Sequence, residues 1–211
     1  MTEASSFGQA GKRVFGVCTL AFGLGYEVTQ IIELLGGFPK PWGHFAIVLP
    51  SLLLAWSWLG FLTLIHETAS LARRPWTRLA LSFATIYATL NSFVYIIQLT
   101  VVVPEALAGG PGFDNAFAMV GGKALTAVNA VAYALLSLSA AFLGLAAQGR
   151  FARVALLAHG ALAPLILAIL YVPALMPAGG LWLFTFPFST GALLAEECGR
   201  RQGYTKSSRQ A

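Results

Sequence analysis

Long apolar segments alternate with short polar stretches along the whole 211-residue chain. A transmembrane helix needs ~20 mostly apolar residues. The segments that meet this condition are 14–35, 45–66, 79–104, 124–147, 152–175 and 181–196. The pattern predicts an all-α fold, a polytopic integral membrane bundle of six transmembrane helices over 14–196. An N-terminal segment (1–13) and a basic tail (197–211) would lie outside the bundle.

Composition supports this class. Charged residues make up 10% of the chain and hydrophobic residues 57%, whereas soluble domains carry roughly 25% charged residues. The basic residues are scattered between apolar segments, which is typical of membrane flanks and not of a nucleic-acid surface. We therefore expect membrane lipids, and no nucleic acid, as partners. Two cysteines, Cys18 and Cys198, are too few for a disulfide framework or a zinc site, and we expect no metal and no cofactor.

The distribution of basic residues predicts the orientation. Cytoplasmic loops of membrane proteins carry an excess of Lys and Arg. With the N-terminus inside, the outer side receives only Lys40 and Lys123. The other basic residues fall on the cytoplasmic side: Lys12, Arg13, Arg73, Arg74, Arg78, Arg150, Arg153, Arg200, Arg201, Lys206 and Arg209. We expect both termini in the cytoplasm and a location in the cell membrane, which in a bacterium is the cytoplasmic membrane.

The third segment carries a polar stripe. In "YATLNSFVYIIQL" (87–99) the polar residues recur at steps of four, four and three: Tyr87, Asn91, Tyr95 and Gln98. At helical spacing they fall within roughly 80° of arc. An amide exposed to hydrocarbon without a partner costs several kcal/mol. This face is therefore predicted to point into the bundle.

The fourth segment repeats part of this pattern. Asn91 and Tyr95 are four residues apart, and so are Asn129 and Tyr133. The two segments run antiparallel, and at 1.5 Å per residue the two asparagines lie within a few ångströms in depth. Two interpretations remain open. These residues line a pocket, or they hold helices together through hydrogen bonds worth on average about 0.6 kcal/mol each.

The first segment contains carboxylates. Glu27 lies deep in "GLGYEVTQIIELL" (23–35), and Tyr26, Gln30 and Glu33 share a neighbouring face. A charge at the bilayer centre costs at least ~2.5–3.5 kcal/mol, and no Lys or Arg occurs at that depth. Glu27 must therefore be neutral, paired or hydrated. A protonated carboxyl bonded to Asn or Tyr is the simplest solution.

Three functions are open at this stage. The first is binding or transport of a small lipophilic or amphipathic molecule in an outward-facing polar pocket. The second is a membrane-embedded isomerase or cyclase acting on a lipid or terpenoid, with Glu27 as the catalytic acid. The third is a structural subunit of a membrane complex, in a homo- or hetero-oligomer. The predicted ligand-binding residues are Glu27, Gln30, Tyr87, Asn91, Tyr95, Gln98, Asn129, Tyr133 and Thr185.

Overall fold

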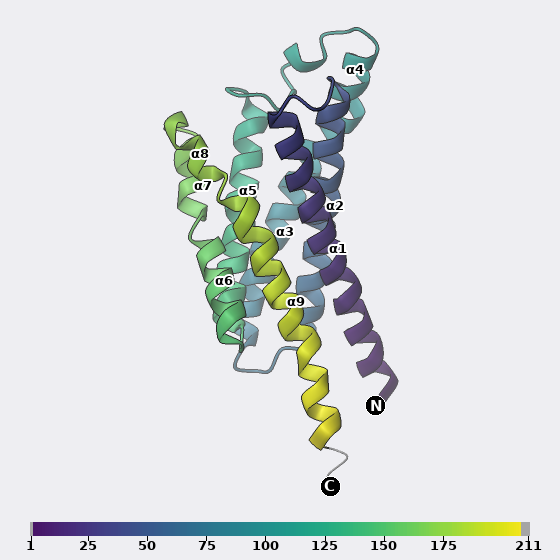
Figure 1. The fold of residues 1–211 in the computed structure, drawn as a ribbon, viewed down its shortest axis with the longest axis vertical. Helices are drawn as coiled ribbons and strands as arrows, with labels where there is room; N and C mark the ends of the chain where they lie inside the picture. Colours follow the sequence, from purple (N-terminus) through teal and green to yellow (C-terminus); the bar gives the residue numbers. More distant parts are fainter. Residues whose placement is uncertain (1, 208–211) are drawn as a thin grey trace.

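The computed structural model describes the backbone of residues 2–207 and the side chains of residues 8–199. All regular structure in this part of the chain is helical. The α-helices, shown in Figure 1, are α1 (Thr2–Leu34), α2 (Trp42–Glu67), α3 (Arg74–Ile97), α4 (Val103–Leu107), α5 (Ala124–Ala146), α6 (Arg150–Gly160), α7 (Ala163–Ile169), α8 (Met176–Gly179) and α9 (Trp182–Ser207). A π-helical turn, η1 (Gln98–Val102), joins α3 to α4, and the short 3-10 turns η2 (Gly112–Asp114) and η3 (Pro173–Leu175) lie in loops.

Six helical stretches within the described residues are long and apolar enough to cross a membrane. They are Gly8–Leu34, Trp42–Glu67, Arg74–Leu107, Ala124–Ala146, Arg150–Ile169 and Pro173–Gly199. This confirms the predicted all-helical, multi-pass membrane architecture. The start of α1 and the end of α9 lie at the same end of the bundle (Figure 1). That common end is called the terminal end below, and the side of the membrane that it faces stays a prediction.

The first and last helices extend beyond the predicted spans. Helix α1 already begins at Thr2, and α9 continues to Ser207. Residue 1 and residues 208–211 of the two predicted flanking segments lie outside the described residues, as do the side chains of the tail from residue 200 onward. At the terminal end, Lys12 of α1 and Glu197 of α9 form an ion pair with an N–O distance of 3.0 Å. Both side chains are buried, so the pair fastens these helices together.

Proline interrupts the fifth predicted helix. The sequence predicts one helix over 152–175, but α6 ends at Gly160 and α7 begins at Ala163. Pro164 has no N–H to donate to the carbonyl of Gly160, so the α-helical hydrogen-bond ladder cannot continue through this point. Beyond Ile169 the chain forms only η3 and the short helix α8 before α9. The predicted end at residue 175 is therefore too late.

The third span contains a wide turn. Its helix continues from α3 through the π-helical turn η1 into α4. Pro104 follows this turn and cannot donate to the carbonyl of Thr100. A π turn inside an α-helix accommodates one additional residue per turn. The chain thus continues in the same direction to Leu107, three residues beyond the predicted end.

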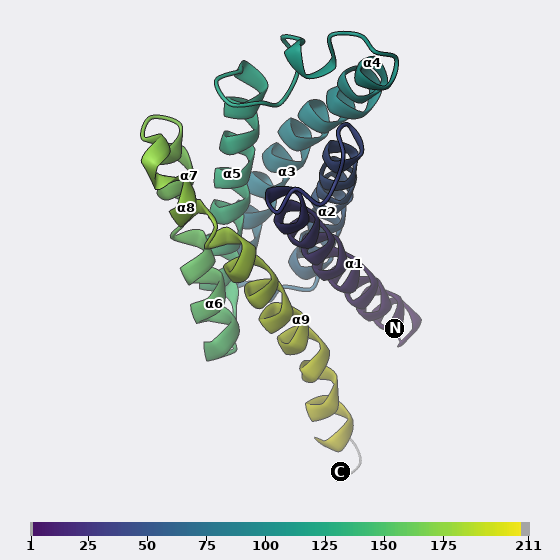
Figure 2. The same cartoon turned by 45° about the horizontal axis from the view of Figure 1, so that its top comes forward.

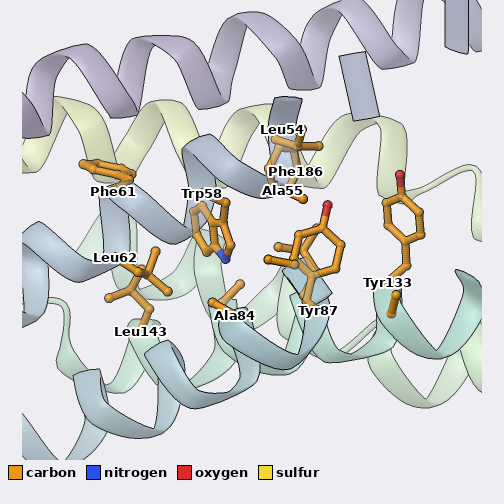
Figure 3. Close-up of a cluster of buried hydrophobic side chains, with 14 of the residues drawn as sticks. Leu54, Ala55, Trp58, Phe61, Leu62, Ala84, Tyr87, Tyr133, Leu143 and Phe186 are labelled. Carbon is orange, nitrogen blue, oxygen red and sulfur yellow. The ribbon is translucent and has the colours of Figure 1, made fainter. Parts of the chain in front are cut away.

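Side-chain packing defines the order of helices in the bundle. Helix α1 packs against α2 and α9, α3 packs against α2 and α5, and α5 packs against α6 and α7. In Figure 2, α7 and α8 lie away from α1, and α9 begins between the α7–α8 segment and α1. The core holds large buried side chains, and in Figure 3 Trp58 of α2 lies between Phe61 on one side and Tyr87 on the other.

Glycine permits close approach at the helix interfaces. A Cβ atom on Gly23 of α1 would lie 2.7 Å from the Phe186 ring of α9. A Cβ atom on Gly160 of α6 would lie 2.4 Å from the Cβ of Ala141 on α5. Lipid tails are as apolar as leucine, so helices in a membrane associate through close packing at small residues. These two glycines fix how closely α1 approaches α9 and α6 approaches α5.

Candidate ligand-binding site

A cavity of about 380 Å³ lies between α1, α5, α7, α8 and α9. Its volume falls near the lower end of the range of ~300–1,000 Å³ that is typical of ligand pockets. Leu34, the last residue of α1, and Thr126, near the start of α5, both line it, so it lies toward the end of the bundle opposite the terminal end. The lining residues are Tyr26, Gln30, Leu34, Thr126, Asn129, Ala130, Tyr133, Ile166, Ile169, Leu170, Met176, Gly179, Gly180, Trp182 and Leu183.

Three aromatic rings form one wall of the cavity. The rings of Tyr26 and Tyr133 stack with centroids 5.8 Å apart. Trp182 meets both edge to face, at 5.6 Å from Tyr26 and 5.1 Å from Tyr133. Trp182 also stacks on Phe186 at 4.8 Å. Because such contacts between rings are favourable beyond their area of burial, this wall is preorganised by its own packing.

Hydroxyl groups connect this wall to the neighbouring helices. The Tyr133 hydroxyl lies 2.9 Å from the Ser51 hydroxyl of α2 and 3.0 Å from the Tyr95 hydroxyl of α3. All three residues are buried. The structure thus brings together Tyr95 and Tyr133, two of the predicted site residues. Only Tyr133 lines the cavity, and Tyr95 lies behind it.

The first half of the predicted polar stripe lies elsewhere in the core. Asn91 Nδ2 donates to the Tyr87 hydroxyl of the same helix at 2.9 Å. Neither residue is exposed or lines the cavity. The Tyr87 ring lies beside the Tyr133 ring, with centroids 6.0 Å apart (Figure 3). The stripe does face the bundle interior, but Asn91 directs its Nδ2 to Tyr87 of the same helix, and its buried Oδ1 has no hydrogen-bond partner among the described residues.

Gln98 anchors a loop. Its Nε2 donates to the carbonyl of Phe117 at 2.7 Å, and its Oε1 accepts from the Met119 N–H at 3.0 Å. His44 Nε2 also donates to Oε1, at 3.0 Å. Gln98 is fully buried and does not line the cavity. It therefore ties the connection between α4 and α5 to α2 and α3.

Amide groups from two helices reach the cavity. Gln30 of α1 lines it and donates through Nε2 to the Tyr26 hydroxyl. Asn129 of α5 lines it one turn before Tyr133, and the side chain of Asn129 interacts with the Tyr95 hydroxyl. Two buried polar atoms of lining residues have no hydrogen-bond partner among the described residues: Asn129 Oδ1 and Trp182 Nε1.

Thr185 positions a histidine outside the cavity. Its hydroxyl lies 2.9 Å from Nδ1 of His159 and donates to the carbonyl of Leu181 at 3.0 Å. Because the single hydroxyl hydrogen serves Leu181, Nδ1 of His159 carries the hydrogen of their shared bond. His159 is fully buried against the rings of Trp182 and Phe186. Neither Thr185 nor His159 lines the cavity.

Glu27 is buried next to the site but not in it. Its side chain is 4% exposed, and Oε1 has no hydrogen-bond partner among the described residues. No ion pair to Glu27 occurs in this part of the chain either. Glu27 does not line the cavity, although its neighbour Tyr26 does. A catalytic acid must reach the atom that it protonates, and this arrangement provides no such contact with a molecule in the cavity.

Sequence reasoning misses several lining residues. The position of Trp182 near a predicted span end favours a residue of the aromatic belt at the membrane surface, but it is only 6% exposed and lines the cavity. Tyr26 shares the face of Gln30 and is not among the predicted site residues. The aliphatic lining residues, such as Ile166 and Leu183, carry no signal in the sequence because they resemble every other apolar residue of the spans.

The site offers phenols, amides and an indole. No group of three or more His, Cys, Asp or Glu side chains that could hold a metal ion occurs among the described residues. The chain matches no protein-family model, and no curated protein or solved structure shows significant similarity to it. Functional inference therefore depends on the geometry of the cavity alone.

Proposed function

We propose that this membrane protein binds a small lipophilic or amphipathic molecule in the cavity between α1, α5, α7, α8 and α9. The observation that carries the proposal is the combination of an apolar cavity of about 380 Å³ with a few polar groups on one preorganised aromatic wall. Ligand pockets have this composition, because apolar walls provide affinity and a few polar groups fix orientation. Three predicted site residues, Gln30, Asn129 and Tyr133, line the cavity.

The rim of the cavity supports access for a membrane-dissolved ligand. Leu34 and Met176 belong to the lining and are 79% and 62% exposed. A molecule can therefore reach the cavity past apolar side chains. With the basic residues on the cytoplasmic side, the cavity opens in the outer half of the membrane, as the positive-inside distribution predicts.

The two alternatives receive less support. A structural subunit explains the hydroxyl contacts of Tyr133, which hold helices together in any case, but it gives no role to the cavity. An acid-base enzyme needs Glu27 at its substrate, and Glu27 lies outside the lining. Transport would add release of the ligand on the other side of the membrane to the binding step proposed here.

A matched pair of variants tests the proposal. Ala130 lines the cavity, whereas Ala127, on the same helix, is exposed and does not. The Ala130→Trp variant fills the cavity with an indole, and Ala127→Trp places the same side chain on the outer surface of α5. We expect native mass spectrometry of the wild type and of Ala127→Trp to show a discrete co-purified molecule, which Ala130→Trp lacks.

A second pair of variants distinguishes the roles of the two asparagines that were predicted to bind the ligand. Asn129 lines the cavity and Asn91 does not. Asn129→Ala is expected to lose the bound molecule, and Asn91→Ala to retain it while losing thermal stability. The same phospholipids on the wild type and Ala130→Trp, with no discrete ligand on either, would contradict the proposal and favour the structural subunit.

A further inference from the structure

We infer that the ligand of this cavity is an uncharged amphiphile with a hydroxyl headgroup, which binds at Asn129 and Trp182. This inference rests on the proposed function and names the chemical class of the ligand. It derives from two properties of the lining: the lack of formal charge, and the complementary hydrogen-bonding character of the two polar atoms that lack a protein partner.

The uncharged lining disfavours ligands with ionic headgroups. None of the described residues that line the cavity is Lys, Arg, His, Asp or Glu. A carboxylate or phosphate headgroup would therefore lose its hydration without gaining an opposite charge, which is strongly unfavourable in an apolar environment. An uncharged headgroup avoids this penalty.

An ammonium headgroup is excluded by the arrangement of the rings. Aromatic cages place a cation over the faces of several rings, within about 6 Å of their centroids. Here the rings of Tyr26, Tyr133 and Trp182 contact one another, with centroids 5.1 to 5.8 Å apart. No space is left between them for an ammonium group. Glu27 and Glu33, the two carboxylates of α1 next to lining residues, do not line the cavity.

The two unpartnered atoms specify a group that both accepts and donates. The indole Nε1–H of Trp182 can only donate, and Oδ1 of Asn129 can only accept. Asn129 lies one helical turn before Tyr133, and the Trp182 ring contacts the Tyr133 ring at 5.1 Å, so both groups flank the same tyrosine. Buried polar atoms without partners are costly. A hydroxyl accepts from the indole and donates to the amide, which satisfies both.

The remainder of the lining suits an apolar chain or ring. Ile166, Ile169 and Leu170 of the α7 segment face the cavity together with Leu183 of α9 and Leu34 of α1. Hydrocarbon packed against these side chains would match the apolar lining. The hydroxyl would contribute the orientation, with the headgroup at the aromatic wall and the hydrocarbon toward α7.

The experiment compares four compounds that carry the same decyl chain and differ in the headgroup: 1-decanol, decyl methyl ether, undecanoate and decyltrimethylammonium. Each is titrated into the purified full-length protein, and the bound fraction is measured by native mass spectrometry. We expect 1-decanol to bind about tenfold more tightly than the ether, because the ether accepts a hydrogen bond but cannot donate one. The two ions are expected to bind more weakly than the alcohol.

Two variants localise the preference. Trp182→Phe removes the indole N–H, and Asn129→Leu replaces the amide with an apolar side chain of the same branching. In Asn129→Leu the ratio of alcohol affinity to ether affinity is expected to fall toward one, because only the alcohol donates to the amide oxygen. In Trp182→Phe the affinities of both compounds are expected to fall while their ratio stays near ten, because both accept from the indole. This ratio is measured within one variant, so partial loss of folded protein does not change it. A preserved tenfold ratio in Asn129→Leu, or an unchanged affinity of both compounds in Trp182→Phe, would overturn the assignment of the headgroup to these residues.

The outcomes separate this inference from the proposed function. If all four compounds bind equally well to the wild type and Ala130→Trp abolishes their binding, the cavity binds ligands but the hydroxyl inference fails. Tightest binding of either ion also overturns the inference. The proposed function fails as well if none of the compounds binds to the wild type, or if Ala130→Trp leaves their binding unchanged.

Discussion

Removal of one hydroxyl group tests how the aromatic wall is attached to the bundle. Tyr133→Phe deletes the central group of the chain that joins Ser51, Tyr133 and Tyr95, and with it hydrogen bonds of 2.9 Å and 3.0 Å. These bonds connect α5 to α2 and α3. The phenylalanine ring keeps the stacking with Tyr26, so the variant isolates the hydrogen bonds.

The expected magnitude follows from the two hydrogen bonds that the Tyr133 hydroxyl makes. A hydrogen bond between helices in a membrane is worth on average about 0.6 kcal/mol, so two bonds give about 1.2 kcal/mol. Ser51 and Tyr95 are fully buried, and each hydroxyl loses one hydrogen bond in a place that water does not reach, which raises the loss toward ~3 kcal/mol. Tyr133→Phe should therefore lower the free energy of unfolding by about 1 to 3 kcal/mol.

The assay is reversible unfolding in mixed micelles, with SDS as the denaturant, followed by circular dichroism. Tyr95→Phe and the double variant complete a double-mutant cycle, and we expect a coupling energy of about 0.6 kcal/mol. Tyr171→Phe is the control, because Tyr171 is 85% exposed and should tolerate the change. A Tyr133→Phe effect no larger than that of the control, or zero coupling with Tyr95, would refute the proposed hydroxyl chain.

Two further predictions concern helix packing and use the same unfolding assay. Lys12→Met should lower the free energy of unfolding by about 3–5 kcal/mol, because it removes one member of a buried ion pair. The double variant with Glu197→Gln should cost less than the sum of the single changes, and strict additivity would contradict a buried pair. Gly160→Ala should cost about 1–3 kcal/mol, because its Cβ would lie 2.4 Å from Ala141 Cβ and 2.8 Å from Ala141 Cα. Gly191→Ala in α9 meets no atom within 4 Å and should be neutral or stabilising; equal losses in both variants would refute the packing argument.

The number and order of spans could be predicted because apolar length alone determines them. The positions at which proline interrupts a helix could not be predicted from apolar length. Pro50 and Pro187 lie inside α2 and α9 without breaking them, whereas Pro164 separates α6 from α7 and Pro104 accompanies a π turn. Neighbouring helices decide whether a proline within a membrane span is accommodated. The presence of the residue in the sequence does not distinguish these outcomes.

The candidate site could be predicted only in part. Periodicity correctly indicated that the stripe from Tyr87 to Gln98 faces the bundle interior. It could not indicate which partner each side chain contacts. Asn91 bonds to Tyr87 of its own helix, and Gln98 bonds to a loop about twenty residues further along the chain. Those partners depend on rotamers and on the loop path, which an amphipathic pattern does not encode.

The most direct test of the account is to locate a bound ligand in the cavity. An uncharged medium-chain amphiphile with a diazirine on its hydrocarbon chain is photoactivated on the purified protein, and the modified residues are mapped by mass spectrometry. The account predicts labels on cavity residues such as Ile166, Ile169 and Leu183, which Ala130→Trp abolishes. Labels confined to exposed residues outside the cavity, such as Phe151 and Phe184, and unchanged in Ala130→Trp would contradict it.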